Sequence, residues 1–129
     1  MRLLVDTHVL LWAVGATRSL ESATRRLLED GRNQVFFSSI SIFEIAAKRA
    51  AGRRSAPSLG AGVVLDLALR LDMQELQVSS AHALAVEAIA LMHPDPFDRM
   101  LLAQAQVEDM RLVTHDETLA SYDSRTILF

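Results

Sequence analysis

The residues best placed to do chemistry are four acids near predicted junctions between strands and helices: Asp6, Glu44, Asp98 and Asp116. Asp6 follows the apolar run MRLLV, Glu44 follows FFSSISIF, and Asp116 follows RLVTH. In an open α/β sheet such junctions lie along one edge, where ligands bind. Four carboxylates gathered at that edge would repel one another unless a cation neutralised them. Because hard divalent cations prefer oxygen ligands, the pattern predicts a Mg²⁺ or Mn²⁺ site in an enzyme that acts on phosphate.

Each of these acids also has a purely structural explanation. Asp6 and Asp116 could cap the helices that follow them, and the segment DPFDR predicts a helix start with Asp95 as its N-cap. Ser41 and Glu44 form the S-x-x-E pattern of a capping box. Capping is the more common role for any one of them. As a set they are harder to explain as caps, because uncharged Ser, Thr or Asn side chains cap about as well without mutual repulsion.

The elements that would position these acids alternate along the chain. Short apolar strands are predicted at residues 2–5, 34–38, 75–78 and 111–114, with a possible fifth at 126–128. Helices are predicted between them, at residues 7–14, 20–30, 41–51, 61–72, 80–91 and 97–108. This alternation indicates βαβ units and a parallel sheet, and the nearly all-apolar strands indicate helices on both faces. We therefore expect an α/β fold, a three-layer α/β/α sandwich with a four- to five-stranded, mainly parallel sheet.

The chain as a whole fits a single domain spanning residues 1–129. Hydrophobic residues make up 50% of it, which is enough to form a core. The absence of cysteine excludes disulfides and thiolate metal sites. Asp6 interrupts the first apolar run, so no signal-peptide pattern opens the chain, and the apolar stretch at 59–73 is too short and charged to span a bilayer. We expect a cytoplasmic protein with no membrane partner.

The charge balance is compatible with an RNA partner once the four acids are set aside. The chain has 16 Asp and Glu against 13 Lys and Arg, so setting four acids aside leaves 12 against 13. The densest basic cluster, and the candidate RNA contact, consists of Lys48, Arg49, Arg53 and Arg54. Arginine suits bidentate contact with phosphate. A solvated helix end stabilised by the helix dipole explains the same cluster, and both interpretations stay open.

The histidines and aromatic residues carry weaker signals. His8 and His115 lie within two residues of candidate acids and could face the cleft, whereas His82 is expected to be peripheral. For each histidine the more common role is a surface or hydrogen-bonded side chain. The aromatic residues in apolar runs are expected in the core, so no aromatic platform for stacking bases is predicted; they are Trp12, Phe36, Phe37 and Phe43.

Four segments of the chain, LLVDTHVLLW, SISIFEIAAK, HPDPFDRMLLAQA and LVTHD, resemble the PIN-domain ribonucleases, most closely the VapC-type toxins of bacterial toxin–antitoxin pairs. The resemblance extends from Met1 to the C-terminus. It implies a parallel sheet between helices, a cognate antitoxin and a homodimer. It also implies that the metal-binding and catalytic carboxylates are Asp6, Glu44, Asp98 and Asp116.

The resemblance extends to supporting positions around these acids. Thr7 and Thr114 match small hydroxyl positions near the site, and Asp95 and Arg99 fall within the matching segment. His115 stands where many members of the family have a small residue, so it would either tune the site or line it.

The leading hypothesis is an endoribonuclease in which the carboxylates hold Mg²⁺ or Mn²⁺, the ions activate water, and the phosphodiester is hydrolysed. Two alternatives remain open. Asp6 could be the nucleophile of an aspartyl-phosphate phosphatase, although such enzymes usually have a second acid two residues later, where this chain has His8. The chain could also be a non-catalytic PIN-like binding module in which the acids serve only as helix caps.

Overall fold

A five-stranded parallel sheet forms the centre of the molecule in the computed structural model, which describes residues 1–16, 21–89 and 95–128. The strands run in the order β3-β2-β1-β4-β5, and every neighbouring pair is parallel. Their bounds are β1 Arg2–Val5, β2 Gln34–Ser38, β3 Gln74–Leu76, β4 Arg111–Thr114 and β5 Ile127–Leu128. The expected parallel sheet is confirmed, and the possible fifth strand is part of it.

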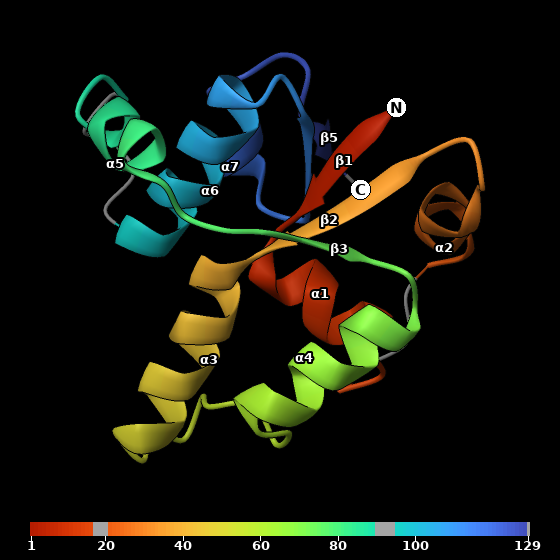
Figure 1. Ribbon diagram of the computed structural model, residues 1–129, viewed down its shortest axis with the longest axis vertical. Coiled ribbons are helices and arrows are strands. Elements are labelled where there is room, and N and C mark those ends of the chain that lie inside the picture. The colour runs from red at the N-terminus through yellow and green to blue at the C-terminus, as the bar shows by residue number, and fades with distance from the viewer. Residues whose placement is uncertain (17–20, 90–94, 129) are drawn as a thin grey trace.

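Helices cover both faces of the sheet (Figure 1). Their bounds are α1 Thr7–Ala13, α2 Ser22–Glu29, α3 Ser39–Ala50, α4 Ala61–Arg70, α5 Ser80–Val86, α6 Pro96–Val107 and α7 Glu117–Ala120. The predicted helix positions at 20 and at 90–91 lie outside the described residues. Over the described part of the chain, no helix is both long enough and apolar enough to cross a membrane.

The core has two parts because successive strand side chains point to opposite faces. Leu3 and Val5 of β1 pack with apolar residues of α1, α3 and α4 on one face, whereas Leu4 packs with α6 and α7 on the other. Figure 1 shows α1, α3 and α4 on one side of the sheet and α5, α6 and α7 on the opposite side. The three-layer sandwich expected from the sequence is therefore confirmed.

The start of α3 corrects one prediction. Ser38, the last residue of β2, caps this helix by accepting a hydrogen bond from the Ile40 backbone at 3.0 Å, so α3 begins at Ser39. The expected capping box of Ser41 and Glu44 is wrong, because both residues lie inside the helix and both are buried. By residue type either Ser38 or Ser41 could cap this helix, and Ser38 does so because β2 ends there. Burial of Ser41 and Glu44 on the inner face of α3 directs both side chains towards α1.

Candidate active site

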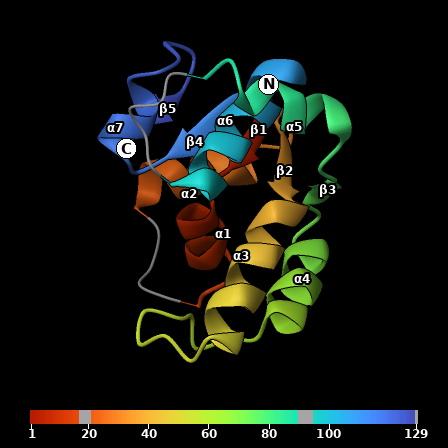
Figure 2. The same ribbon diagram turned by 90° about the vertical axis from the view of Figure 1, so that its left-hand side faces the viewer.

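The order of the strands brings three chain segments to one edge of the sheet. β1 lies between β2 and β4, so the carboxyl ends of these strands meet and pass into α1, α3 and α7. Asp98 reaches the same edge from the first turn of α6, which follows α5 and not a strand. The sequence-based placement of Asp98 at a strand exit is therefore wrong, although its place at a helix start is confirmed. Figure 2 shows the first turns of α1, α3 and α6 close together.

Asp6 is the most constrained of the four acids. It is 3% exposed and caps α1, with one carboxylate oxygen accepting from the Val9 backbone at 2.8 Å. Thr114 Oγ1 donates to its other oxygen at 2.5 Å, and the same hydroxyl accepts from the Asp116 backbone at 3.0 Å. Burial raises the pKa of Asp6, the two hydrogen bonds oppose the rise, and the negative charge of Asp116 adds to it. Asp6 is thus fixed in orientation and costly to ionise without a nearby cation.

Glu44 enters the site from the second turn of α3. Its Oε1 accepts a hydrogen bond from Thr7 Oγ1 at 2.8 Å, and Thr7 Oγ1 also lies 2.9 Å from Ser41 Oγ. Lys48 Nζ, one helical turn further on, lies 2.6 Å from Glu44 Oε2. Glu44 is only 5% exposed, so both of its oxygens are held by neighbours in a largely dry setting. The i,i+4 spacing of Glu44 and Lys48 can be read from the sequence, whereas the burial of Glu44 cannot.

The pKa of Asp98 responds to burial and to the charges of the other acids. Its pKa is raised to about 7, first by burial and then by the negative charges of four neighbours, which are Asp95, Asp6, Glu44 and Asp116. Burial is the largest cause of this rise, and the four negative charges add to it. Asp6, Glu44, Asp95 and Asp116 therefore lie close enough to Asp98 for their charges to act on it.

The helix caps predicted around these acids are present as well. Asp95 accepts from the Phe97 backbone at 2.9 Å at the start of α6. Asp116 accepts from the Thr118 and Leu119 backbones at 2.8 and 3.1 Å at the start of α7. Capping and clustering thus coexist, because the helix starts that need caps also meet at the sheet edge.

The oxygen donors of these acids suit a hard divalent cation, and burial makes Asp6 and Asp98 costly to ionise without one. In residues 1–16, 21–89 and 95–128, no three acidic or histidine side chains stand at the spacing of a formed metal site. The fit to Mg²⁺ or Mn²⁺ is therefore one of donor chemistry and not of formed coordination geometry.

The comparisons with known proteins decide the family. Residues 3–124 match the PIN domain, which is most of the chain. The chain is a PIN domain. No curated protein sequence matches it.

Solved structures with the same fold are distant in sequence. VapBC2 of Rickettsia felis, bound to a DNA fragment from its promoter, matches with a TM-score of 0.71 at 17% identity, covering 100% of this chain and 98% of the other. DNA-bound VapBC of Salmonella typhimurium matches with a TM-score of 0.70 at 18% identity, covering 100% and 97%. FitAcB of Neisseria gonorrhoeae matches with a TM-score of 0.64 at 18% identity, covering 98% and 96%. The PIN-like fold predicted from the sequence is thereby confirmed.

The candidate basic cluster of this PIN domain divides into three roles. Lys48 bonds to Glu44 inside the site. Arg49 Nη1 donates to the backbone carbonyls of Pro57 and Ser58 at 2.6 and 3.2 Å, so it holds the loop between α3 and α4. Arg53 and Arg54 are exposed on that loop. Arg49 is exposed as well, but its guanidinium is engaged by the two carbonyls, so Arg53 and Arg54 are better placed for contact with an RNA backbone.

The remaining supporting residues, His8, His115 and Arg99, differ in their positions and contacts. His8 is exposed and lines the same cavity as Glu44, and a positive charge on its ring would lower the pKa of Asp6. His115 is exposed, and its ring meets Trp12 edge to face at 5.3 Å between centroids. Arg99 Nη2 donates to the Val86 backbone at 3.2 Å, which ties α6 to the end of α5.

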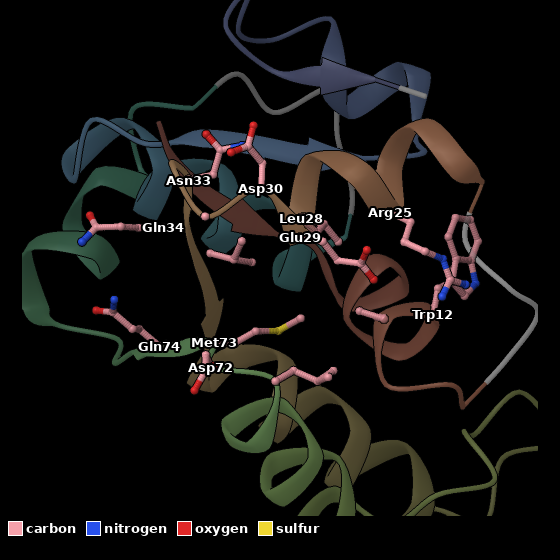
Figure 3. A pocket seen from close by; sticks show the side chains of 14 residues that line it. Trp12, Arg25, Leu28, Glu29, Asp30, Asn33, Gln34, Asp72, Met73 and Gln74 are labelled. Carbon is pink, nitrogen blue, oxygen red and sulfur yellow. The ribbon is translucent and has the colours of Figure 1, made fainter.

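Two cavities are lined in part by residues of α1. One of about 230 Å³ opens beside the acids and is lined by Glu44 and Lys48, by Thr7 and His8, and by residues 55–58. The other, of about 470 Å³, is lined by none of the four acids (Figure 3). Its labelled walls run from Trp12 and Arg25 to Gln34 and Gln74 near the starts of β2 and β3. The smaller cavity is therefore the one that adjoins the candidate chemistry.

Proposed function

We propose that this PIN domain is an endoribonuclease that hydrolyses RNA phosphodiester bonds with Mg²⁺ or Mn²⁺, and that it is the toxin of a VapBC-type toxin–antitoxin pair. The observation that carries the proposal is the convergence of Asp6, Glu44, Asp98 and Asp116, with two of them almost fully buried. A folded protein that gathers buried carboxylates without a cation loses stability. A nuclease metal site explains why the chain keeps them together.

Neighbouring groups orient the carboxylates that would hold the metal ion. Thr114 and the Val9 backbone orient Asp6, and Thr7 orients Glu44, so both carboxylates would meet a cation in fixed directions. Asp98 lies in the first turn of α6, where the helix dipole favours negative charge. A bound divalent cation would supply an activated water nucleophile and charge stabilisation for the phosphate.

Lys48 places a positively charged side chain beside Glu44. Its ammonium lies 2.6 Å from Glu44, and its side chain is 29% exposed, so it borders both the acids and the smaller cavity. A phosphate placed over the carboxylates would find a positive charge at this position. In this scheme Lys48 orients Glu44 and attracts the phosphate.

Three partners accompany this function. RNA is the substrate, and a cognate antitoxin would restrain the activity in the cytoplasm. Structural neighbours support an antitoxin partner, because they include VapBC2 of Rickettsia felis, VapBC of Salmonella typhimurium and a toxin–antitoxin complex from Klebsiella pneumoniae. A homodimer is expected on the same family grounds, and light scattering of the purified chain would measure it.

The direct test is digestion of structured RNAs with the purified chain in Mn²⁺ and in EDTA, with the cleavage ends mapped. Internal cleavage that needs the metal is expected. A phosphate ester assayed beside the RNA, with trapping of a phosphoenzyme, covers the aspartyl-phosphatase alternative.

A binding module with acids serving only as caps is the other alternative, and the caps at Asp6, Asp95 and Asp116 are what favour it. Thermal unfolding with and without Mn²⁺ separates the two functions, because a real metal site stabilises the fold on binding. A melting temperature that does not respond to Mn²⁺, together with intact RNA, would reject the nuclease.

A further inference from the structure

An exposed aromatic ring stands next to the carboxylate cluster. Phe43 of α3 is 59% exposed, although the sequence placed it in the core, and that prediction is wrong. Among the described Phe, Tyr and Trp side chains it is the only exposed one. An aromatic side chain with an exposed face can stack on a nucleobase.

The ring has a built support. The Phe43 and Phe97 centroids lie 6.0 Å apart with an angle of 53° between the planes. Phe97 sits in the first turn of α6, where Asp95 accepts a hydrogen bond from its backbone at 2.9 Å and Pro96 occupies the first helical position. The cap fixes the backbone of Phe97, and the tilted contact between the two rings then limits where the ring of Phe43 can go.

Both rings are direct sequence neighbours of candidate metal ligands. Phe43 precedes Glu44 on α3, and Phe97 precedes Asp98 on α6. Figure 2 shows the first turns of these two helices side by side at the edge where α1 begins. A flat group resting on Phe43 would therefore be next to whatever the carboxylates hold.

We propose that Phe43, supported by Phe97, is a stacking platform for an unpaired nucleobase adjacent to the phosphodiester at the carboxylates. The proposal rests on the ribonuclease function and adds a base-contacting residue beside the proposed site. Bases in a helix are stacked on each other, so only an unstacked base can lie on a protein ring. Every base has a π-face, so the platform selects single strands over duplexes without reading a particular base.

Two substitutions of Phe43 separate stacking from simple apolar contact. Phe43→Trp keeps an aromatic face, whereas Phe43→Leu keeps an apolar side chain without one. Both variants should fold, because the ring is mostly exposed. Leu84→Ala is the control, since Leu84 is 71% exposed on α5, a helix that carries none of the four acids.

Affinity for a single-stranded RNA oligonucleotide is measured in Mn²⁺ with Asp98→Asn in the background to prevent cleavage. Stacking on an aromatic ring contributes about 1–3 kcal/mol per base, so Phe43→Leu should weaken binding at least about fivefold. Phe43→Trp and Leu84→Ala should bind like the parent. Loss of the aromatic ring should leave the salt dependence of binding unchanged, because no phosphate contact is removed. In the cleaving protein, Phe43→Leu should raise KM with Mn²⁺ stabilisation of the fold intact.

Three results would overturn the platform. Unchanged affinity and KM in Phe43→Leu, in a protein that still cleaves RNA, would reject it and leave the nuclease standing. A change in oligomeric state of Phe43→Leu by light scattering would assign the ring to an interface between copies of the chain. Absence of both cleavage and RNA binding in the parent protein would reject the platform and the proposed function together.

Discussion

Two buried polar regions of this PIN domain contrast in how they handle charge. At the junction of α5 and α6, His82 is 1% exposed, so its expected peripheral position is wrong. It accepts a hydrogen bond from the Ser79 backbone at 2.9 Å, and its Nε2 lies 2.8 Å from a Glu108 oxygen. Because Nδ1 accepts, Nε2 carries the proton and donates to the acid. At the carboxyl edge of the sheet, like charges and burial instead raise the pKa of Asp98 to about 7.

Under the proposed function, the difference separates a region that stabilises the fold from one that binds a metal ion. Both ring nitrogens of His82 have hydrogen-bond partners, which is how buried polar groups usually lower the free energy of the fold. The acidic edge keeps negative charges together, and that arrangement stabilises the fold only when a cation joins it. Substitutions at the two regions should therefore affect different measurements.

The largest expected effect is on activity at the acidic edge. Asp98→Asn should lower RNA cleavage by at least about 100-fold, because it removes a negative charge that a metal site needs, and metal ions supply several kcal/mol of transition-state stabilisation. The fold should remain, since asparagine keeps the shape at a half-buried helix position. Cleavage kinetics in Mn²⁺ alongside circular dichroism measure both. Wild-type rates in a well-folded variant would remove Asp98 from the site.

The reverse pattern is expected for the His82 region. His82→Leu should lower the free energy of unfolding by about 1–3 kcal/mol, because buried donors and acceptors lose their partner. The Mn²⁺ affinity of the folded protein should not change. Urea unfolding gives the first quantity, and Mn²⁺ titration at a temperature where the variant is folded gives the second. A large loss of Mn²⁺ affinity with little loss of stability would contradict the contrast between the two regions.

The pH dependence of stability sharpens the comparison. In the metal-free protein the folded state holds a proton on Asp98 up to about pH 7, whereas the unfolded chain releases it near the ordinary value of 3.8. The folded state therefore binds more protons between these values, and its stability should fall as the pH rises from about 4 to about 7. Melting temperatures of wild type and Asp98→Asn in EDTA at pH 5 to 8 measure this.

The difference in melting temperature between the wild type and Asp98→Asn at each pH separates the effect of Asp98 from that of histidines, which ordinarily titrate in the same range. The wild type should lose more stability with rising pH than the variant does. Parallel curves would show that Asp98 ionises normally and that the charge cluster is weaker than the structure implies.

The smallest expected effect is in RNA binding by the exposed arginines. Arg53→Gln with Arg54→Gln should flatten the slope of log affinity against log salt by about one unit, because fewer counterions are released. Arg49 is left intact because it holds the carbonyls of Pro57 and Ser58. The exposed pair Arg25 and Arg26 on α2 is the matched control. Equal slopes in both double variants would exclude the loop from RNA contact.

Elements defined by local pattern were predictable from the sequence. β1, β2 and β4 have the bounds that their apolar runs predicted, because each run is short and bordered by a residue that begins a helix or loop. The caps at Asp6, Asp95 and Asp116 were predictable for the same reason, since a cap bonds within three residues. The identities of the clustered acids followed from these junctions.

Only the tertiary structure decided how those residues meet. Asp98 reaches the cluster through the path of α6 across the sheet, and no local spacing contains that path. Ser41 and Glu44 face Thr7 because α3 packs on α1, and Phe43 is exposed because α3 and α6 leave the outer side of their contact open to solvent. Sequence pattern sets hydrogen bonds and periodicity over a few residues, whereas burial and charge clustering depend on packing between segments far apart in the chain.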